Sequence, residues 1–505
     1  MGQNTLLVKA ILLLNDHLHR GYGALKDADP SVDHILFIES ERMLHTRTWH
    51  IQRLFFLLSA RDHFLQDLRD EGFTVTFIRS STTSDGIEEF RNKYPDAEIR
   101  VAEPSSHQQY EQLQNEGLHF VPNDFFLTSR LLFAQWANAQ KNLVMENFYR
   151  AQRVRLNILM EGNHPVGGRW NYDSDNRLPP PKGDHRWPTY CEHSRDEIDA
   201  AVLADIRSRK IPVFGKNPDS TWGTTRKAAL NQLRHFLEHS FAEFGAYEDA
   251  MTPDTWAVNH SLLSPYLNIG LLHAEEVVEA ALDKYLQGGI PLASAEGFIR
   301  QIIGWREYIN GLYWHFGDSY RENNSLIATR PLLPLYVDAS ATQMKCVATQ
   351  IEDIDARSWV HHIPRLMVLS NLALISGVSP QEFLDWMRRA FIDAADWVMV
   401  PNVIGMSLHA DGGQLATKPY AAGGSYISTM GKYCKSCAFN PKKRIGDDAC
   451  PFTTLYWDFL DRNQERFATN HRMAQQLAGL KRLNDLPQLR ERAVEVLELL
   501  SRGQL

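Results

Sequence analysis

The chain has 505 residues, of which 44% are hydrophobic and 23% charged, and its formal net charge is −8 at pH 7. These proportions are ordinary for a globular protein, and the length allows two or three domains. Because the chain is acidic, a nucleic-acid site would have to be a local basic patch and not a general property of the surface. Five cysteines are too few for a disulfide scaffold of this size, which favours a reducing cytoplasm.

The first segment, MGQNTLLVKAILLLND, contains an apolar run that is too short to span a membrane. It lacks the positively charged start and the small-residue cleavage site of a secretory signal. Leu6 stands where a myristoylated protein carries Ser or Thr. We therefore expect a cytoplasmic protein that contacts no membrane, and we take it to be a monomer.

Strand-like and helix-like segments alternate over residues 5–130. The predicted strands lie at 8–14, 34–38, 73–78, 99–102 and 119–121, and the predicted helices at 48–68, 86–94 and 108–116. This alternation predicts an α/β domain with a doubly wound parallel sheet. Ligands of such sheets lie at the carboxyl ends of the strands, so Asp16 and Glu39 are candidate ligand contacts. Loop capping explains both carboxylates equally well.

The strand pattern stops at Leu131, and helical periodicity dominates the rest of the chain. Residues 133–160 are predicted to form a helix, and the Gly/Pro-rich stretch 162–194 is predicted to be an ordered connection. The sequence therefore predicts an α/β domain at 1–130, a connecting segment at 131–223 and a large all-α domain at 224–505.

Three of the five cysteines, Cys434, Cys437 and Cys450, lie close together, and Cys346 lies far upstream. Four thiols without a histidine suit either a tetrahedral zinc or a cubane iron–sulfur centre. A single Cys-x-x-Cys step and the aromatic surroundings favour iron–sulfur, with zinc and ordinary buried thiols as the alternatives. The fifth cysteine, Cys191, is expected to be structural.

Two segments of the helical half carry polar residues suited to a ligand. Ser261 and Ser264 precede a helical run, where they either hold a phosphate or cap the helix. The segment WVHHIPR contains His361 and His362 in apolar surroundings, where each histidine needs a partner or a task. Arg365 lies four residues beyond His361, and we predict that it forms an ion pair with Asp396.

The segments SLLSPYLNIG, GWREY, HHIPR, DWVMVPN and YCKSC…DDACPFT together resemble the photolyase/cryptochrome family. More narrowly, they are similar to its iron–sulfur bacterial branch, which includes the prokaryotic (6-4) photolyases. The match covers nearly the whole chain. It implies an α/β antenna domain, a long connector and a helical domain that holds a U-shaped FAD.

The resemblance also implies roles for single residues. The four clustered cysteines match [4Fe–4S] ligands, and His361 and His362 match the catalytic histidine pair, with His362 as the proton donor. A 6,7-dimethyl-8-ribityllumazine antenna is implied, with Asp16 and Glu39 as its contacts. The implied FAD-binding residues are Ser261, Leu263, Ser264, Gln301, Trp305, Arg306, Arg365, Asp396 and Asn402.

The implied reaction is light-driven repair of UV-damaged DNA. Excited reduced FAD donates an electron to a (6-4) photoproduct that is flipped out of the duplex, and the electron returns after bond rearrangement. Lys418, Tyr420 and Tyr426 are our candidates for phosphate and base contacts, and PKKR at 441–444 is a local basic patch.

Some positions depart from the pattern of this branch. Trp386 fits one station of an aromatic electron-transfer chain, but Met387 and Asp338 stand where Tyr and Trp are expected. Asn15 to Leu18 also departs from the usual Gly-Asp-Gln-Leu, which weakens the antenna assignment. A cryptochrome-like blue-light photoreceptor without repair activity is therefore the alternative, and a light-independent flavin or RNA-binding protein is a third.

Overall fold

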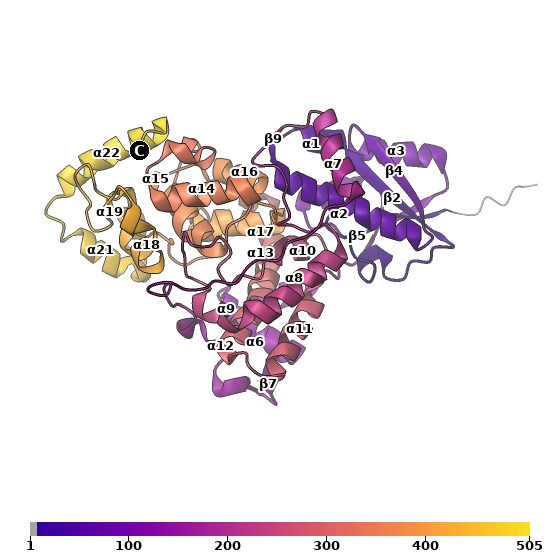
Figure 1. Cartoon of the computed structure of the whole chain (residues 1–505), viewed down its shortest axis with the longest axis horizontal. Helices are drawn as coiled ribbons and strands as arrows, with labels where there is room; N and C mark the ends of the chain where they lie inside the picture. Colours follow the sequence, from indigo (N-terminus) through magenta and orange to yellow (C-terminus); the bar gives the residue numbers. More distant parts are fainter. Residues whose placement is uncertain (1–7) are drawn as a thin grey trace, which may run out of the picture.

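The computed structural model describes residues 8–505, as an α/β part and a larger helical part (Figure 1). Residues 1–7, on which the exclusion of a signal peptide and of myristoylation partly depends, lie outside the described residues. Within residues 8–505, no helix is both long and apolar enough to cross a membrane.

The α/β part is built on a five-stranded sheet in which neighbouring strands are parallel, in the order β4-β2-β1-β5-β6. The strands are β1 (Lys9–Leu12), β2 (Asp33–Ser40), β4 (Thr74–Ser80), β5 (Glu98–Ala102) and β6 (His119–Val121). Every residue of β2 is buried, which explains its continuous apolar sequence HILFI. The strand order reverses between β1 and β5, so the predicted doubly wound sheet is confirmed.

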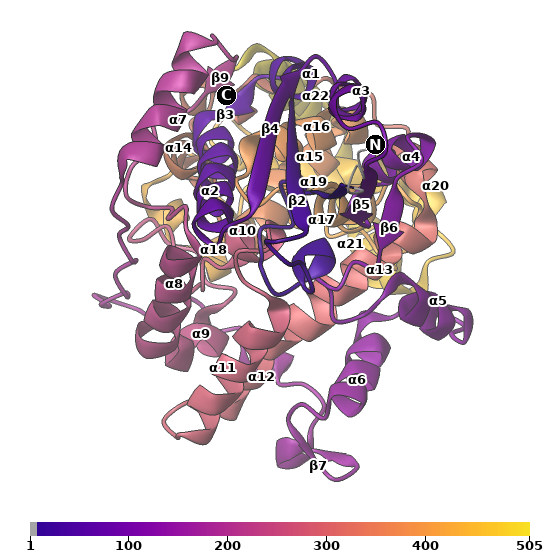
Figure 2. The same ribbon diagram turned by 90° about the vertical axis from the view of Figure 1, so that its right-hand side faces the viewer.

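Helices cover both faces of this sheet (Figure 2). On one face, α2 (Ile51–Asp70) packs on Ile11, Ile35 and Phe37. On the other face, α3 (Thr83–Lys93) and α4 (His107–Asn115) pack on Leu12, Leu36 and Ile38. Alternate strand residues therefore enter two separate cores. A short helix, α1 (Glu41–His45), follows β2.

The connection between the two parts differs in detail from its prediction. In place of one helix at 133–160 there are α5 (Arg130–Asn138) and α6 (Met145–Leu156), and α6 ends at Asn157 in a left-handed conformation with φ 53°. Further along, α7 (Glu197–Ser208) packs Val202 and Ile206 against α2. Short strand pairs also form, β3 (Trp49–His50) with β9 (Val213–Phe214) and β7 (Met160–Glu161) with β8 (His164–Pro165).

The remaining residues form the predicted helical part. Its α-helices are α8 (Arg226–His239), α9 (Phe241–Tyr247), α10 (Ser264–Asn268), α11 (Ala274–Leu286), α12 (Leu292–Ile299), α13 (Glu307–Phe316), α14 (Lys345–Arg357), α15 (Asn371–Ser376), α16 (Pro380–Ala390), α17 (Asp396–Val400), α18 (Gly424–Met430), α19 (Pro451–Arg462), α20 (Gln464–Phe467), α21 (Ala474–Leu480) and α22 (Leu486–Arg502).

Three segments of this part are π-helices: η4 (Arg300–Arg306), η8 (Pro364–Ser370) and η9 (Pro401–Ser407). Two of them begin at a proline, which has no N–H for the ordinary helical hydrogen bond. Short π-helical segments within α-helices occur frequently at functional sites. All three carry residues that the sequence singled out, namely Gln301, Trp305, Arg306, Arg365 and Asn402.

Candidate active site

Three histidines meet in front of η8. His260 comes from the loop before α10, and His361 and His362 come from the residues before η8. The His260 ring centroid lies 4.4 Å from that of His361 in a stacked pair, and 5.5 Å from that of His362. His361 is buried, whereas the His362 side chain is 52% exposed, with its Nε2 3.4 Å from Asp249 Oδ1. The sequence predicted two of these histidines, and the structure adds the third.

Burial divides these histidines into two kinds. Burial lowers the pKa of His260 and His361 well below the usual value, and the neighbouring histidines and Arg365 lower both further. Both rings are therefore neutral near pH 7. His362 alone combines solvent exposure with a carboxylate neighbour, so its ring is the one that a ligand can reach from solvent.

Arg365 forms its ion pair with Asp393 and not with Asp396, so the predicted pair is wrong. Its two terminal nitrogens lie 2.9 and 3.0 Å from the two Asp393 oxygens, and its Nε donates to Val360 O at 2.6 Å. Asp396, at the start of α17, instead pairs with Arg388 and lies 3.5 Å from Arg321. The two carboxylates are three positions apart, and only Asp393, in the turn before α17, faces η8.

Ser264 lies at the same ion pair. Its hydroxyl donates to Asp393 Oδ2 at 2.6 Å, and Asn268 Nδ2 donates to the Asp393 carbonyl at 2.7 Å. The first turn of α10 and the Arg365–Asp393 pair thus form one hydrogen-bonded unit. This unit lies near the histidines, since the charge of Arg365 contributes to the lowered pKa of both His260 and His361.

The other predicted FAD-binding residues have local contacts. Ser261 Oγ accepts from Leu263 N, and Leu263 is buried in the core. Gln301 donates to Gly297 O, and Asn402 donates to Val398 O, each one turn back along its own helix. Arg306 pairs with Glu307 at 2.7 Å and lies over the Phe126 ring, and Trp305 packs beside Tyr308.

Several buried polar atoms near these residues have no hydrogen-bond partner among the described residues. They are Nδ2 and Oδ1 of Asn259, Nε2 of His260, Nε1 of Trp359, Nδ1 of His361, Nε of Arg306 and the hydroxyl of Tyr308. A buried polar atom without a partner costs about 1–3 kcal/mol. Such a group of atoms is what a polar ligand would satisfy.

The four predicted cluster cysteines come together from three segments. Cys346 lies in α14, Cys434 in the short helix η10 (Tyr433–Ser436) with Cys437 directly after it, and Cys450 precedes α19. Burial raises the pKa of the Cys346 thiol well above its usual value, and the other three thiols add to that shift. Burial likewise raises the pKa of Cys450 to about 11.

The spacing of these sulfurs separates the sequence alternatives. No three of the four Sγ atoms, all within the described chain, lie within 4.8 Å of one another. A tetrahedral zinc with bonds of about 2.3 Å holds its sulfurs about 3.8 Å apart. A cubane takes each thiolate on a different iron and needs a wider set. The described sulfurs therefore do not form the close set that a single tetrahedral zinc ion holds.

The two candidate antenna residues have different surroundings. Glu39 is buried within an ion-pair network, with Arg209 at 2.7 Å, Arg79 at 3.1 Å and Arg61 also in contact. This network favours a structural role for Glu39. Asp16 follows β1 at the switch point of the sheet, where the neighbouring His17 ring stacks on Phe125 at 4.7 Å.

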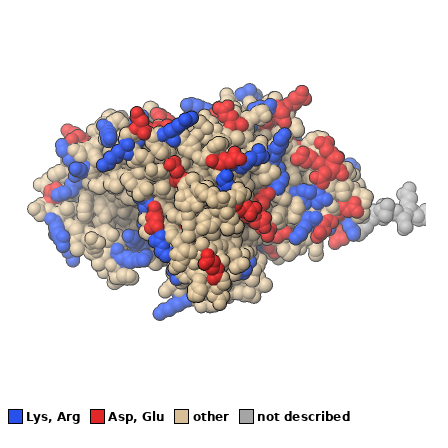
Figure 3. All heavy atoms as spheres, turned by 60° about the horizontal axis from the view of Figure 1, so that its bottom comes forward, with Lys and Arg blue, Asp and Glu red and all other residues tan. Residues whose placement is uncertain are grey.

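Of the candidate DNA contacts, Tyr426 lies nearest to the histidines. Tyr426, in α18, lies close enough to Asp249 for that charge to contribute to its raised pKa, after burial. Tyr420 is 37% exposed, and Lys418, two residues before it, is half-buried. On the face shown in Figure 3, basic side chains are frequent over the C-terminal half and acidic ones over the N-terminal half.

The basic patch at 441–444 is weaker than the sequence suggests. Lys443 pairs with Asp448 at 2.7 Å, and Arg444 pairs with Asp485 at 2.9 Å. These pairs offset two of its three positive charges.

Trp386 lies in a buried aromatic group. Its ring centroid is 4.9 Å from that of Tyr336, and its Nε1 donates to Tyr336 O at 3.0 Å. Met387 is buried beside it, whereas Asp338 caps the short helix η7 (Ala339–Ala341) at the surface. Neither of these two residues supplies a further ring.

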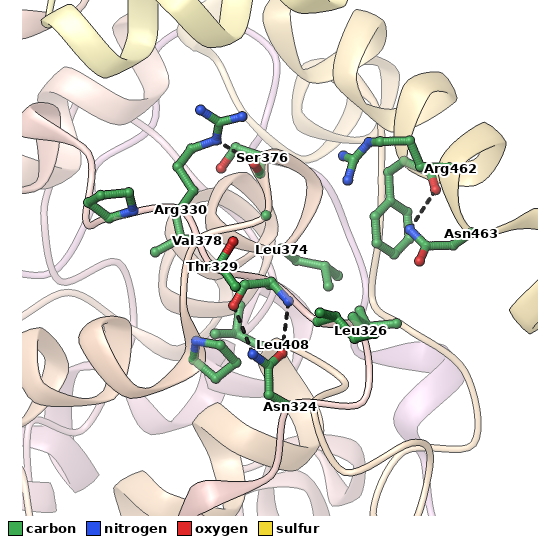
Figure 4. A pocket seen from close by; sticks show the side chains of 16 residues that line it. Asn324, Leu326, Thr329, Arg330, Leu374, Ser376, Val378, Leu408, Arg462 and Asn463 are labelled. Carbon is green, nitrogen blue, oxygen red and sulfur yellow. Dashed lines mark hydrogen bonds between the residues drawn. The ribbon is translucent and has the colours of Figure 1, made fainter.

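A cavity of about 330 Å³ lies apart from the predicted site residues (Figure 4). Two of its lining residues, Arg330 and Arg462, donate to the carbonyls of Ser376 and Ile375 at the end of α15. These contacts cap the helix, so the arginines have a structural role.

The fold matches known photolyase and cryptochrome structures. The chain aligns over 99% of both chains with a bacterial class III photolyase from Agrobacterium tumefaciens, with a TM-score of 0.59 and 16% identity. It aligns over 81% of its length, and 83% of the other chain, with a cryptochrome from Synechocystis, with a TM-score of 0.54 and 14% identity. At these identities the likeness shows the fold alone.

Sequence comparison is more specific. Residues 11–222 match the family model of deoxyribodipyrimidine photo-lyase-related proteins. A (6-4) photolyase of Agrobacterium fabrum is 39% identical over 487 residues, which cover 94% of this chain and 96% of that protein. The chain therefore belongs to the photolyase/cryptochrome family, and within that family to the (6-4) photolyases.

The family binds FAD, and the helical part fits such a group. The unpartnered atoms of Asn259 and Trp359 are buried hydrogen-bonding groups that a flavin or its phosphates would satisfy. No sequence pattern pointed directly to His260 or Asp393. Asn259 and His260 do begin the quoted segment NHSLLSPYLNIG, and Asp393 lies three residues before the quoted Asp396.

Proposed function

We propose that the chain performs light-dependent repair of (6-4) pyrimidine–pyrimidone photoproducts in DNA. The observation that carries this proposal is the exposed His362 beside Asp249, backed by the neutral rings of His260 and His361. The 39% identity to a (6-4) photolyase over nearly the whole chain supports it. Bound FAD would supply, on excitation by light, the electron that starts the repair.

His362 is the proton donor in this proposal. Its ring is the exposed member of the group, where a base flipped out of the duplex can reach it. The Asp249 carboxylate, 3.4 Å from Nε2, restrains the orientation of this ring. His361 and His260 are neutral, so they do not compete for this proton and instead position the His362 ring.

The residues around η8 orient the flavin. Arg365 is held by Asp393, by Val360 O and indirectly by Ser264, so its charge has a fixed position. Ser261 and Leu263 lie beside Ser264, at the start of α10, where phosphates would bind. Gln301, Trp305, Arg306 and Asn402 lie on the π-helices η4 and η9 and complete the proposed cofactor set.

Cys346, Cys434, Cys437 and Cys450 bind a [4Fe–4S] cluster in this proposal. The mutual effects of the thiols and their wide spacing support it. The cluster would connect α14, η10 and α19 within one core. Cys346→Ser should give protein without the cluster, measured as iron and acid-labile sulfide, whereas Cys191→Ser should keep both.

UV-damaged DNA binds across Tyr420, Tyr426 and Lys418 in the proposed complex. The tyrosine rings would stack on bases, each worth about 1–3 kcal/mol. For the 6,7-dimethyl-8-ribityllumazine antenna, Asp16 is the contact with better support, because it lies at the sheet's switch point. We propose a cytoplasmic monomer.

The test is direct repair. Purified protein carrying flavin is illuminated with oligonucleotides that contain either a (6-4) photoproduct or a cyclobutane dimer. Restoration of the (6-4) lesion alone is the expected result. Restoration of the cyclobutane dimer alone would contradict the substrate assignment.

The second candidate is a blue-light photoreceptor. The altered aromatic chain favours it, because Met387 and Asp338 supply no ring to continue electron transfer from Trp386. In that case, illumination would change the flavin spectrum while neither lesion is restored.

A further inference from the structure

The three histidines in front of η8 have the composition of a transition-metal site. One ring nitrogen from each of His260, His361 and His362 lies within 4.8 Å of the other two. Three imidazoles are the protein ligands of many zinc sites, with the fourth position left open. Residues 8–505 contain one other such group, His63 with Asp196 and Asp199, which has a single histidine.

Two inaccessible ring nitrogens, one on buried His361 and one on half-buried His260, are a second sign of a ligand. His361 is 4% exposed, and its Nδ1 has no hydrogen-bond partner within the described chain. Nε2 of His260 is likewise inaccessible and unpartnered. Most buried polar side-chain atoms in proteins have a partner. The stacked rings of His260 and His361 therefore each have one nitrogen that is free to bind a ligand.

The loop at 248–250 lies beside all three rings. The backbone at Glu248 acts to raise the pKa of His260, and the backbone at Ala250 acts to raise that of His361, against the larger lowering by burial. Nε2 of His362 faces the Asp249 carboxylate at 3.4 Å. Metal-binding histidines commonly use their other nitrogen on a carbonyl or carboxylate, which fixes the ring for the metal. A single loop thus provides outer contacts for the whole set.

We propose that His260, His361 and His362 bind a divalent transition-metal ion of the Zn²⁺ class, with Asp249 beside it. A tetrahedral ion with bonds of about 2.0–2.1 Å places its nitrogens about 3.4 Å apart. The rings would close by up to about 1.4 Å, which small side-chain rotations achieve. Imidazole suits Zn²⁺, Cu²⁺ and Ni²⁺, whereas Mg²⁺ prefers oxygen ligands.

The ion would compete with the proposed proton on His362. A nitrogen that coordinates the metal has no lone pair left for a proton, so the metal-bound protein would not repair. This consequence rests on the proposed function, whereas the metal site itself does not. Zn²⁺ would therefore act as a reversible inhibitor of repair.

Metal binding is tested on the protein that carries FAD and its full iron content, after treatment with EDTA. Calorimetric titration with Zn²⁺ should give one strong site, which His260→Gln and His361→Gln each weaken at least about ten-fold. The matched control is His239→Ala, which removes one of two adjacent surface histidines on α8, and it should leave the strong site unchanged. Mg²⁺ should not occupy the site.

Two outcomes would overturn the metal site. One is Zn²⁺ affinity in His260→Gln and His361→Gln equal to that of the unaltered protein. The other is loss of the strong site in His239→Ala alone. Flavin absorbance checks that each variant is folded.

The repair assay then tests the consequence separately. Zn²⁺ should abolish (6-4) repair in the unaltered protein, and EDTA should restore it. Unimpaired repair with the site saturated would contradict the competition. A protein that binds Zn²⁺ but never repairs would leave the metal site intact and refute the proposed function instead.

Discussion

The ion-pair network around Glu39 and the histidine group around His260 are both buried and polar, but only the first is satisfied internally. Glu39 contacts three arginines, and its carboxylate lies in a closed network. In the second region, Nε2 of His260 and Nδ1 of His361 are buried without partners. A satisfied network stabilises the fold, whereas unpartnered atoms cost stability unless a ligand binds there. This difference in hydrogen bonding distinguishes a structural region from a ligand-binding region on the structure alone, without comparison to related proteins.

Removing the centre of the satisfied network should have the largest effect. Glu39→Ala leaves Arg61 buried with one carboxylate partner fewer, and breaking a buried pair in this way costs about 3–5 kcal/mol. Chemical denaturation should show this loss in the free energy of unfolding. Glu41→Ala is the control, because Glu41 contacts Arg209 from a partly exposed position, and a loss of at most about 1 kcal/mol is expected. Equal losses in both variants would contradict the contrast.

His362→Ala should abolish catalysis without affecting the fold. General acid catalysis contributes at least about 100-fold, so repair of the (6-4) lesion should fall by at least that factor. Flavin content and the denaturation midpoint should be unchanged, because the ring is exposed. Repair at the original rate would remove His362 from the mechanism.

Two carboxylates in one short segment allow a matched test of the corrected ion pair. Asp393→Asn removes the charge that holds Arg365 and accepts from Ser264, so FAD affinity should fall about ten-fold. Asp396→Asn breaks pairs with Arg321 and Arg388 and should change FAD affinity far less. Flavin release on dilution measures both. A larger loss of FAD affinity in Asp396→Asn than in Asp393→Asn would support the Arg365–Asp396 pair predicted from the sequence.

Glu248, beside the histidines, should make stability depend on pH. Burial raises its pKa from the usual 4.5 to about 8. Arg300 lowers this pKa, and the nearby carboxylates raise it. The folded chain therefore holds this proton more tightly than the unfolded chain. Its stabilising contribution is complete below pH 4.5 and declines as pH rises towards 8, by at most about 1.4 kcal/mol per pH unit.

Glu248→Gln should remove this decline. Denaturation of both proteins across the interval measures the difference between their curves, which cancels the other titrating groups. Parallel curves would show that Glu248 does not hold the proton.

The sheet and the helical part could both be predicted from the sequence, because both have strong hydrophobic patterns. The apolar run HILFI identified β2, and the alternation of strands and helices predicted the parallel sheet. It placed a single helix where α5 and α6 form, since periodicity does not show a break of a few residues.

Contacts between distant segments were less predictable. Asp393 and Asp396 both follow an apolar stretch, and only the turn before α17 decides which one faces Arg365. His260 joins the histidine pair from about 100 positions away, a distance that no local spacing rule covers. The π-helices escaped prediction for a related reason, because their apolar spacing resembles that of α-helices.

One of the cores links the two parts of the molecule. Ile11 and Phe56 from the sheet and α2 belong to the same apolar cluster as Phe241, Leu263 and Ile392 from the helical part. An isolated α/β part would expose to water the surface through which its residues contact the rest of that cluster, at about 25 cal/mol for each Å² of apolar surface. The two parts should therefore melt together in one cooperative transition, in which a calorimeter would record a single heat-absorption peak. The arrangement of the proposed FAD-binding residues then depends on an intact sheet, although the sheet contributes none of these residues.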